Sequence, residues 1–159
     1  MTMREIRALA LDVDGVLTDG GFWLGETGEC FKRFAFRDVM GVSLARERGL
    51  RFVLITGEGG PLLEGLARKF GVTEVRGHCR DKAGALRDYA REQGLALEAI
   101  CFLGDDVNDL TAMAIAGQSA APSDAHPAVL ARAARVLSRP GGQGAVREWL
   151  DLWLSGQDT

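Results

Sequence analysis

Short apolar runs alternate with amphipathic segments along most of this chain. Buried strands are predicted at residues 6–13, 51–55 and 100–103, and shorter strands at 73–75, 119–121 and 134–137. Apolar positions at helical spacing predict helices at 39–48, 61–70, 82–92, 109–116, 127–133 and 145–154. This alternation is typical of α/β proteins in which helices cover a parallel sheet. We therefore expect residues 1–159 to form one α/β domain whose last helix spans about 145–154.

Residues 20–36 depart from this alternation. Two short segments flank the sequence Gly25-Glu26-Thr27-Gly28, which predicts a β-hairpin with a four-residue turn. The aromatic residues of this stretch are Phe22, Trp23, Phe31, Phe34 and Phe36. A two-stranded ribbon cannot bury so much apolar surface by itself. We expect the hairpin to join subunits, since it would otherwise promote aggregation.

The composition is that of an ordinary globular protein, with 47% hydrophobic and 26% charged residues. A net charge of −3 gives no electrostatic basis for binding nucleic acid or an anionic membrane. No apolar run reaches the roughly 18 residues that span a bilayer, and the N-terminus does not resemble a signal peptide. The three cysteines, Cys30, Cys79 and Cys101, lack metal-binding spacing and are expected to be reduced thiols. These features predict a cytoplasmic protein.

The candidate chemistry begins where the first predicted strand ends, at Asp12-Val13-Asp14-Gly15. Residues i and i+2 of a strand point to the same side, which places Asp12 and Asp14 together. Two carboxylates in a dry site repel unless a cation or a shared proton compensates, and Mg²⁺ prefers oxygen ligands. One carboxylate could then attack phosphorus while the other transfers a proton. This pattern is typical of phosphoryl transfer.

Three later features supply the other groups that such chemistry needs. Thr56-Gly57 follows the strand at 51–55 and offers a hydroxyl and a backbone N–H to phosphate oxygens, although Thr-Gly is also a common turn. Asp81 is a candidate N-cap, and Lys82 would place an ammonium at a helix N-terminus, unless it is a solvated surface lysine.

The third feature is Gly104-Asp105-Asp106-Val107-Asn108-Asp109, which follows the strand at 100–103. It could complete an Mg²⁺ shell with Asp12 and the backbone carbonyl of Asp14, although an Asx-turn and helix cap would use similar residues.

The order of these four motifs resembles the haloacid dehalogenase (HAD) superfamily of phosphatases. Within it, the chain resembles the capless branch of 3-deoxy-D-manno-octulosonate 8-phosphate (KDO 8-phosphate) phosphatases over nearly its whole length. The hairpin and the sequence Gly141-Gly142-Gln143-Gly144-Ala145-Val146-Arg147-Glu148 also match features of that branch. The resemblance implies a HAD-like Rossmannoid three-layer α/β/α sandwich with a parallel central sheet, a protruding hairpin at about 20–36 and no cap domain.

The resemblance also implies roles for the matching residues. Asp12 would be the nucleophile that forms an aspartyl-phosphate, and Asp14 would act as general acid and then base. Thr56 and Gly57 would hold the phosphoryl group and Lys82 would neutralise it. The residues implied for the Mg²⁺ site are Asp12, Asp14, Asp105 and Asp109, with Asp105 completing the metal shell and Asp109 orienting it from just behind. The resemblance further implies a homotetramer assembled through the hairpin at about 20–36, in which each subunit would partly cover its neighbour's site.

The substrate is less well determined than the chemistry. The implied substrate is a keto-deoxy sugar acid phosphate, either KDO 8-phosphate or a nonulosonate 9-phosphate. Glu58 and Lys69 resemble the nonulosonate enzymes, whereas Leu66 stands where both groups have arginine.

Basic residues near the hairpin and in the tail could contact the sugar acid, or could simply be solvated or paired locally: Lys32, Arg33, Arg37 and Arg147. The alternative function is a non-catalytic HAD-like module, related to domains fused to sugar cytidylyltransferases. Such a module is expected to have lost one of the four motifs.

Overall fold

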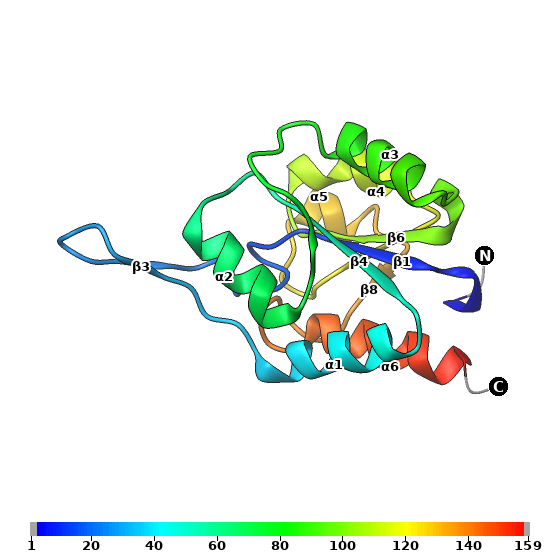
Figure 1. Ribbon diagram of the computed structural model, residues 1–159, viewed down its shortest axis with the longest axis horizontal. Coiled ribbons are helices and arrows are strands. Elements are labelled where there is room, and N and C mark those ends of the chain that lie inside the picture. The colour runs from blue at the N-terminus through cyan, green and yellow to red at the C-terminus, as the bar shows by residue number, and fades with distance from the viewer. Residues whose placement is uncertain (1–2, 158–159) are drawn as a thin grey trace.

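A computed structural model describes residues 3–157 and contains a parallel sheet of six strands (Figure 1). The strand order is β5-β4-β1-β6-β7-β8, so β1, the first strand of the sheet in sequence, lies near its centre. The strands are β1 (Ala8–Leu11), β4 (Arg51–Ile55), β5 (Glu74–Arg76), β6 (Ile100–Leu103), β7 (Gln118–Ala121) and β8 (Arg135–Val136). Every pairing within this sheet is parallel, as the alternation of apolar and amphipathic segments predicts.

Helices cover both faces of the sheet. One face packs against α1 (Phe36–Glu47), α2 (Pro61–Phe70) and α6 (Ala145–Gln157). The other packs against α3 (Lys82–Gln93), α4 (Leu110–Ile115) and α5 (Pro127–Leu130). Short 3₁₀ turns occur at Met3–Glu5, Leu97–Ala99 and Val107–Asp109. None of the helices within residues 3–157 is both long and apolar enough to cross a bilayer.

Strands β1 and β6 are apolar at every position because both of their faces are buried. In β1, Leu9 and Leu11 pack under α1 and α6, whereas Ala8 and Ala10 face α3 and α4. Successive side chains of a strand point to opposite faces, so each strand contributes side chains to the hydrophobic core on each side of the sheet. The helices lie above and below the sheet in Figure 1, which gives the expected three-layer α/β/α sandwich. No cap domain covers the carboxyl edge of the sheet within the described residues.

The sequence predictions of helices and strands are confirmed in number and order, with differences at their ends. The spans of β4, β6 and α2 match the predictions, whereas β1 is four residues long instead of the predicted span 6–13. Helix α1 begins at Phe36 rather than at 39, and α5 ends at Leu130 rather than at 133. Backbone hydrogen bonds define where each helix and strand ends, whereas the predictions followed the apolar residues. The predicted and observed ends therefore differ by a few residues.

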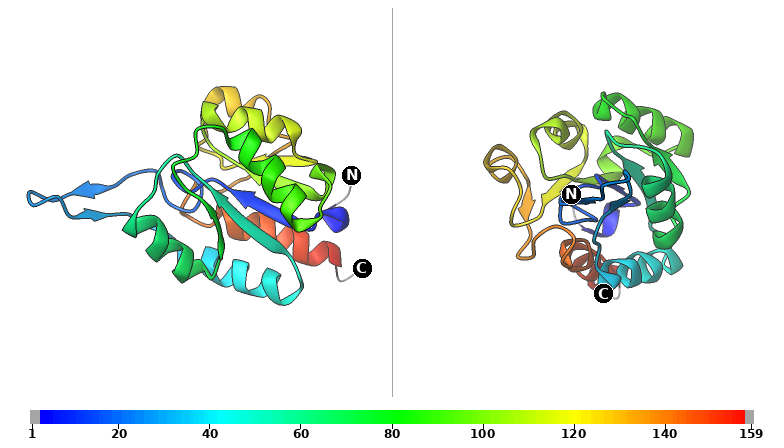
Figure 2. Two further views of the ribbon diagram at one scale, coloured as in Figure 1. Left: turned by 45° about the horizontal axis from the view of Figure 1, so that its top comes forward. Right: turned by 90° about the vertical axis from the view of Figure 1, so that its left-hand side faces the viewer.

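The β-hairpin is formed by β2 (Trp23–Leu24) and β3 (Cys30–Phe31). The strands are antiparallel, with Trp23 opposite Phe31, and the Gly25 N–H donates to the Glu29 carbonyl across the predicted turn at 2.8 Å. The paired part is shorter than the predicted span of 20–36. Figure 2 shows that the hairpin projects far from the sheet and helices.

A buried carboxylate of α1 caps the N-terminus of α6. Asp38 is fully buried, and its Oδ1 accepts a hydrogen bond from the backbone N–H of Arg147 at 2.7 Å. Burial raises the pKa of Asp38 above its ordinary value, and backbone N–H groups of Arg147 and Gly144 oppose that shift. The contact joins residues 109 positions apart in the chain.

We expect Asp38→Ala to lower the free energy of unfolding by about 1–3 kcal/mol, because the variant leaves buried N–H groups without an acceptor. Urea unfolding followed by circular dichroism measures this. Asp88→Ala removes an exposed carboxylate that pairs with Arg91 within α3, and should change stability by less than about 0.5 kcal/mol. Equal effects of the two substitutions would contradict the capping role.

Candidate active site

The predicted catalytic residues converge at the carboxyl edge of the parallel sheet. Asp12 and Asp14 follow β1, Thr56 follows β4, and Asp105 follows β6. Strands β1, β4 and β6 are adjacent, so their carboxyl ends meet at one place. Lys82 reaches the same place as the first residue of α3, where Asp81 caps the helix by accepting from the Gly84 N–H at 2.8 Å.

Lys82 lies buried between two carboxylates. Its Nζ is 3.0 Å from Asp12 Oδ1 and 2.6 Å from Asp109 Oδ1, and its side chain is 1% exposed. Burial alone would lower the pKa of Lys82, but the charges of Asp12 and Asp109 raise it above the ordinary value. The ammonium is therefore held charged beside the proposed nucleophile, as the prediction for Lys82 requires.

Three carboxylates lie close enough to hold one metal ion. Asp12, Asp105 and Asp109 each offer an oxygen, and these oxygens lie within 4.8 Å of one another. Burial, followed by the charge of Asp109, raises the pKa of Asp12 to about 6. Burial and the charges of Asp12 and Asp109 raise the pKa of Asp105 to about 8. A cation bound between Asp12 and Asp105 would relieve this repulsion.

The Asp105 side chain fits the requirement for a metal ligand. Its Oδ1 is buried and has no hydrogen-bond partner among the described residues. Both oxygens of Asp109 are already engaged, Oδ1 by Lys82 and Oδ2 by the backbone N–H groups of Asp105 and Asp106 at 2.9 and 3.2 Å. Asp109 therefore orients the loop and the lysine, whereas Asp105 offers its unpartnered Oδ1 to a metal and Asp12 contacts Lys82 through Oδ1. The Asp14 carboxylate lies outside this group, so a metal ligand from this residue would be its backbone carbonyl.

We expect Mg²⁺ to raise the melting temperature by about 5–10 °C, because a ligand at 100 times its Kd adds about 2.7 kcal/mol. Asp105→Asn should abolish this rise and also make the protein in EDTA more stable, because one of the repelling carboxylates is gone. Thermal unfolding of both proteins with Mg²⁺ and with EDTA measures the two effects. An unchanged response of Asp105→Asn to Mg²⁺ would place the ion elsewhere.

Gly15 permits the catalytic loop to approach Asp105. Its φ is +86°, and a Cβ at this position would overlap the Asp105 carboxylate. Gly49 has a similar φ of +89° but nothing within 4 Å of the corresponding Cβ position. Substitution of either glycine would strain the left-handed backbone, but only a side chain at Gly15 would also collide with the acidic cluster.

Gly15→Ala and Gly49→Ala should each cost about 1–2 kcal/mol of stability through the left-handed backbone. Only Gly15→Ala should also remove the stabilisation by Mg²⁺, because the new methyl group displaces Asp105. Melting temperatures with Mg²⁺ and EDTA distinguish the two variants. A normal Mg²⁺ response in Gly15→Ala would show that the loop can move without loss of the metal.

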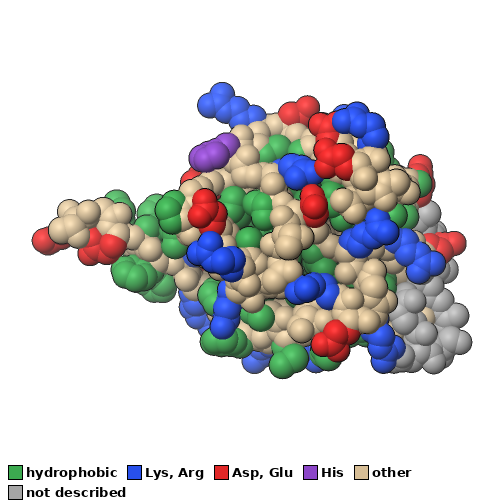
Figure 3. Space-filling model, viewed as in Figure 1, with side chains coloured by type: hydrophobic (Ala, Val, Ile, Leu, Met, Phe, Trp, Pro, Cys, Tyr) green, Lys and Arg blue, Asp and Glu red, His purple; other side chains and the backbone are tan. Residues whose placement is uncertain are grey.

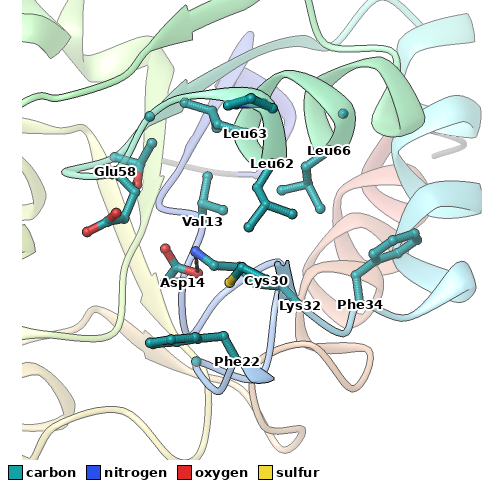
Figure 4. Close-up of a pocket in the computed structure, with 15 residues that line it drawn as sticks. Val13, Asp14, Phe22, Cys30, Lys32, Phe34, Glu58, Leu62, Leu63 and Leu66 are labelled. Atoms are coloured by element: carbon teal, nitrogen blue, oxygen red, sulfur yellow. Dashed lines mark hydrogen bonds and ion pairs between the residues drawn. The ribbon is translucent and has the colours of Figure 1, made fainter. Parts of the chain in front are cut away.

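A cavity of about 580 Å³ opens beside Asp14 and Thr56. Figure 4 shows its walls, with the side chains of Leu62, Leu63 and Leu66 from α2 facing Phe22 and Cys30 from the hairpin. Lys32, just after β3, places its Nζ 2.7 Å from Asp14 Oδ1. The cavity therefore joins the predicted catalytic residues to a mostly apolar surface that could contact the leaving group.

The structure separates the predicted sugar-binding residues. Glu58 lines the cavity, and Gly57 is exposed immediately after Thr56. Lys69 places its ammonium 4.8 Å from the centre of the Phe36 ring, and Arg33 approaches Asp19 at 4.0 Å. Arg147 pairs with Asp151 at 2.7 Å and lines a separate cleft along α6. Within this single chain, only Glu58 and Gly57 of the five lie next to the catalytic residues.

Sequence reasoning treated Lys32 only as one of several basic residues near the hairpin and missed its contact with Asp14. No sequence signal links two residues 18 positions apart across an irregular loop. The resemblance places Asp109 behind Asp105, and the structure gives both of its oxygens to Lys82 and the backbone.

Comparison with known proteins agrees with this fold. A sequence-family model described as haloacid dehalogenase-like hydrolase matches residues 60–148. The chain belongs to the haloacid dehalogenase-like hydrolases. Its curated relatives include phosphoric monoester hydrolases. One of them, the 3-deoxy-D-manno-octulosonate 8-phosphate phosphatase of Escherichia coli strain K12, is 39% identical over 153 residues, which cover 96% of this chain and 81% of the relative.

Two solved structures of similar proteins have the same fold and contain a metal ion. The Moraxella catarrhalis KDO 8-phosphate phosphatase, solved in complex with magnesium, phosphate and KDO, aligns with a TM-score of 0.95 at 29% identity, covering 98% of this chain and 90% of that one. The cobalt-bound Haemophilus influenzae phosphatase aligns with a TM-score of 0.94 at 33% identity, covering 98% and 91%. The acidic cluster of this chain could hold such an ion.

Proposed function

We propose that this protein is a Mg²⁺-dependent phosphatase that hydrolyses a keto-deoxy sugar acid phosphate, either KDO 8-phosphate or a nonulosonate 9-phosphate, through an aspartyl-phosphate. The observation that carries this proposal is the convergence of Asp12, Asp14, Thr56, Lys82 and Asp105 at one edge of the sheet. The curated relatives and the Moraxella catarrhalis complex support the sugar acid.

The reaction proceeds in two steps. An Asp12 oxygen attacks phosphorus, and the leaving alcohol takes a proton from Asp14 as the bond to phosphorus breaks. Asp14, now a carboxylate, removes a proton from the water that attacks the aspartyl-phosphate and releases inorganic phosphate. Lys82 neutralises charge beside Asp12, while Thr56 and the Gly57 N–H hold the phosphoryl oxygens.

The metal would be held by Asp12, Asp105 and the backbone carbonyl of Asp14, with Asp109 behind Asp105. When bound, Mg²⁺ neutralises the phosphoryl oxygens and aligns them with the nucleophile.

The sugar portion would enter the cavity beside Glu58, and additional cations would come from a neighbouring subunit. Among residues 3–157 of one chain, a single basic residue, Lys32, lines the cavity, and that residue is paired with Asp14. A carboxylated sugar needs further positive charge, for which Arg33, Lys69 and Arg147 are candidates from another copy.

The hairpin would assemble a homotetramer. Trp23 and Phe31 are 62% and 61% exposed although they face each other across the ribbon. Figure 3 shows hydrophobic side chains gathered along the hairpin behind an acidic tip. Apolar surface of this extent favours association, and with no cap domain the site would be covered by a neighbouring subunit. The three cysteines are free, which agrees with a cytoplasmic location.

The test is release of inorganic phosphate from KDO 8-phosphate, nonulosonate 9-phosphates and simple sugar phosphates, with Mg²⁺ and with EDTA. Strong Mg²⁺-dependent preference for one sugar acid phosphate is the expected result. If the folded protein releases phosphate from none of them, the non-catalytic module related to cytidylyltransferase-fused domains becomes the better description.

A further inference from the structure

Lys32 makes a charged contact between the hairpin and the catalytic loop. Its Nζ lies 2.7 Å from Asp14 Oδ1, and its side chain is only 18% exposed. Figure 4 shows its ammonium directed at the Asp14 carboxylate. The other groups of the site follow sheet strands or begin α3, whereas Lys32 comes from the projecting ribbon.

Lys32 and Lys82 occupy different sides of the site. Lys82 is buried against Asp12 and Asp109 and does not line the cavity, whereas Lys32 lines it with Asp14 and Thr56. Lys32 is the single lysine or arginine among the residues that line this cavity in the described part of the chain. Its position next to Asp14 therefore places it on the side where the leaving group would lie.

The hydrogen bonds of the Asp14 carboxylate to the described residues fall on one oxygen. Oδ1 accepts from Lys32 Nζ and, at 3.3 Å, from Thr18 Oγ1. The Thr18 hydroxyl in turn accepts from the Gly20 N–H at 3.2 Å, and the backbone of Thr18 pairs with Phe34 at the base of the hairpin. Two donors on Oδ1 fix the rotation of the carboxyl group and leave Oδ2 for a reacting oxygen.

We propose that Lys32 is a positioning residue that holds Asp14 Oδ1 so that Oδ2 faces the oxygen of the leaving alcohol. This inference rests on the proposed function. As the bond from Asp12 to phosphorus forms, the bond from phosphorus to the leaving oxygen breaks and its electron pair stays on that oxygen. The proton on Asp14 Oδ2 then passes to this oxygen, and Lys32 holds the carboxylate that remains.

Leaving groups of different basicity test this role. A sugar or alkyl phosphate needs a proton on its leaving oxygen, whereas p-nitrophenyl phosphate releases a stable phenolate without one. Phenyl phosphate has nearly the same shape as p-nitrophenyl phosphate but a more basic leaving group. The value of kcat/KM covers the steps through departure of the alcohol, so it excludes the later role of Asp14 as a base.

Lys32→Met should lower kcat/KM about 30-fold or more for the alkyl phosphate, less for phenyl phosphate, and within about 3-fold for p-nitrophenyl phosphate. Lys32→Arg should restore most of the loss, because a guanidinium can donate to the same oxygen.

Arg91→Met, which removes an exposed cation of α3, controls for net charge. Size-exclusion chromatography and thermal unfolding establish that the compared variants are folded and equally assembled. If Lys32→Met does not fold, the comparison is made with Lys32→Gln and Lys32→Arg.

Equal losses for all three substrates would overturn the inference. A rise in KM confined to the sugar acid phosphate would also overturn it and would assign Lys32 to the sugar carboxylate. If the wild type hydrolyses none of the substrates, the proposed function fails as well. An active wild type in which Lys32→Met has no effect overturns this inference alone.

Discussion

Asp12→Asn is expected to lower phosphate release about 10⁴-fold or more while leaving the fold intact. Asparagine has nearly the same shape as aspartate, but its amide is too weak a nucleophile to form the phosphorylated enzyme. The substitution also removes one of the oxygens that the metal would contact. The measurement is kcat/KM for the best substrate at saturating Mg²⁺, with circular dichroism and melting temperature as tests of the fold.

The matched control for this prediction is Asp88→Asn, which removes an exposed carboxylate of α3. Its activity should equal that of the wild type. Activity of Asp12→Asn above about one-tenth of the wild-type value would mean that another group attacks phosphorus, and the proposed mechanism would have to be abandoned.

Lys82→Met should reduce both stability and activity. Methionine fills a similar volume but leaves Asp12 and Asp109 buried without their shared cation, which typically costs about 3–5 kcal/mol. Loss of charge neutralisation at the phosphoryl group should also lower kcat/KM about 10²–10³-fold, which is the effect of removing one preorganised donor. Urea unfolding and steady-state kinetics measure the two effects separately.

The pH dependence of the wild type gives an independent measure of the Lys82 contribution. Because the folded pKa of Lys82 is raised above 10.5, its ion pairs contribute fully below that value and are lost only as the pH rises beyond it. The stability difference between wild type and Lys82→Met should therefore be large at neutral pH and shrink in strong alkali. A difference below about 1 kcal/mol at neutral pH would contradict the buried-pair interpretation.

Much of the catalytic core could be predicted from the sequence because its residues follow directly from strands. The runs that form β1 and β6 are apolar at every position, and that of β4 is apolar after Arg51, since helices cover both faces. In a parallel sheet such strands end at a common edge, so Asp12, Thr56 and Asp105 had to come near one another once the strands were adjacent. Each strand and the catalytic residue after it lie within a few positions of one another, so both can be recognised from local sequence.

The hairpin shows where local sequence is less informative. The turn at Gly25–Gly28 was predicted correctly, but only Trp23–Leu24 and Cys30–Phe31 pair as strands. The apolar side chains of the hairpin indicate that another surface buries them. They do not specify which surface that is or how it is oriented. Lys69 illustrates the same limit, since in this chain its ammonium lies over Phe36 at the base of the hairpin.

By itself, the sequence determined the α/β class, the order of the elements and the carboxylates at the strand ends, because burial and strand periodicity act over a few neighbouring residues. Only the tertiary structure decided which side chains pair across long separations. Lys32 meets Asp14, Lys82 lies between Asp12 and Asp109, and Asp38 caps α6. These contacts depend on how loops and helices pack in space, and a charged side chain can find its partner at any sequence distance once desolvation makes pairing necessary.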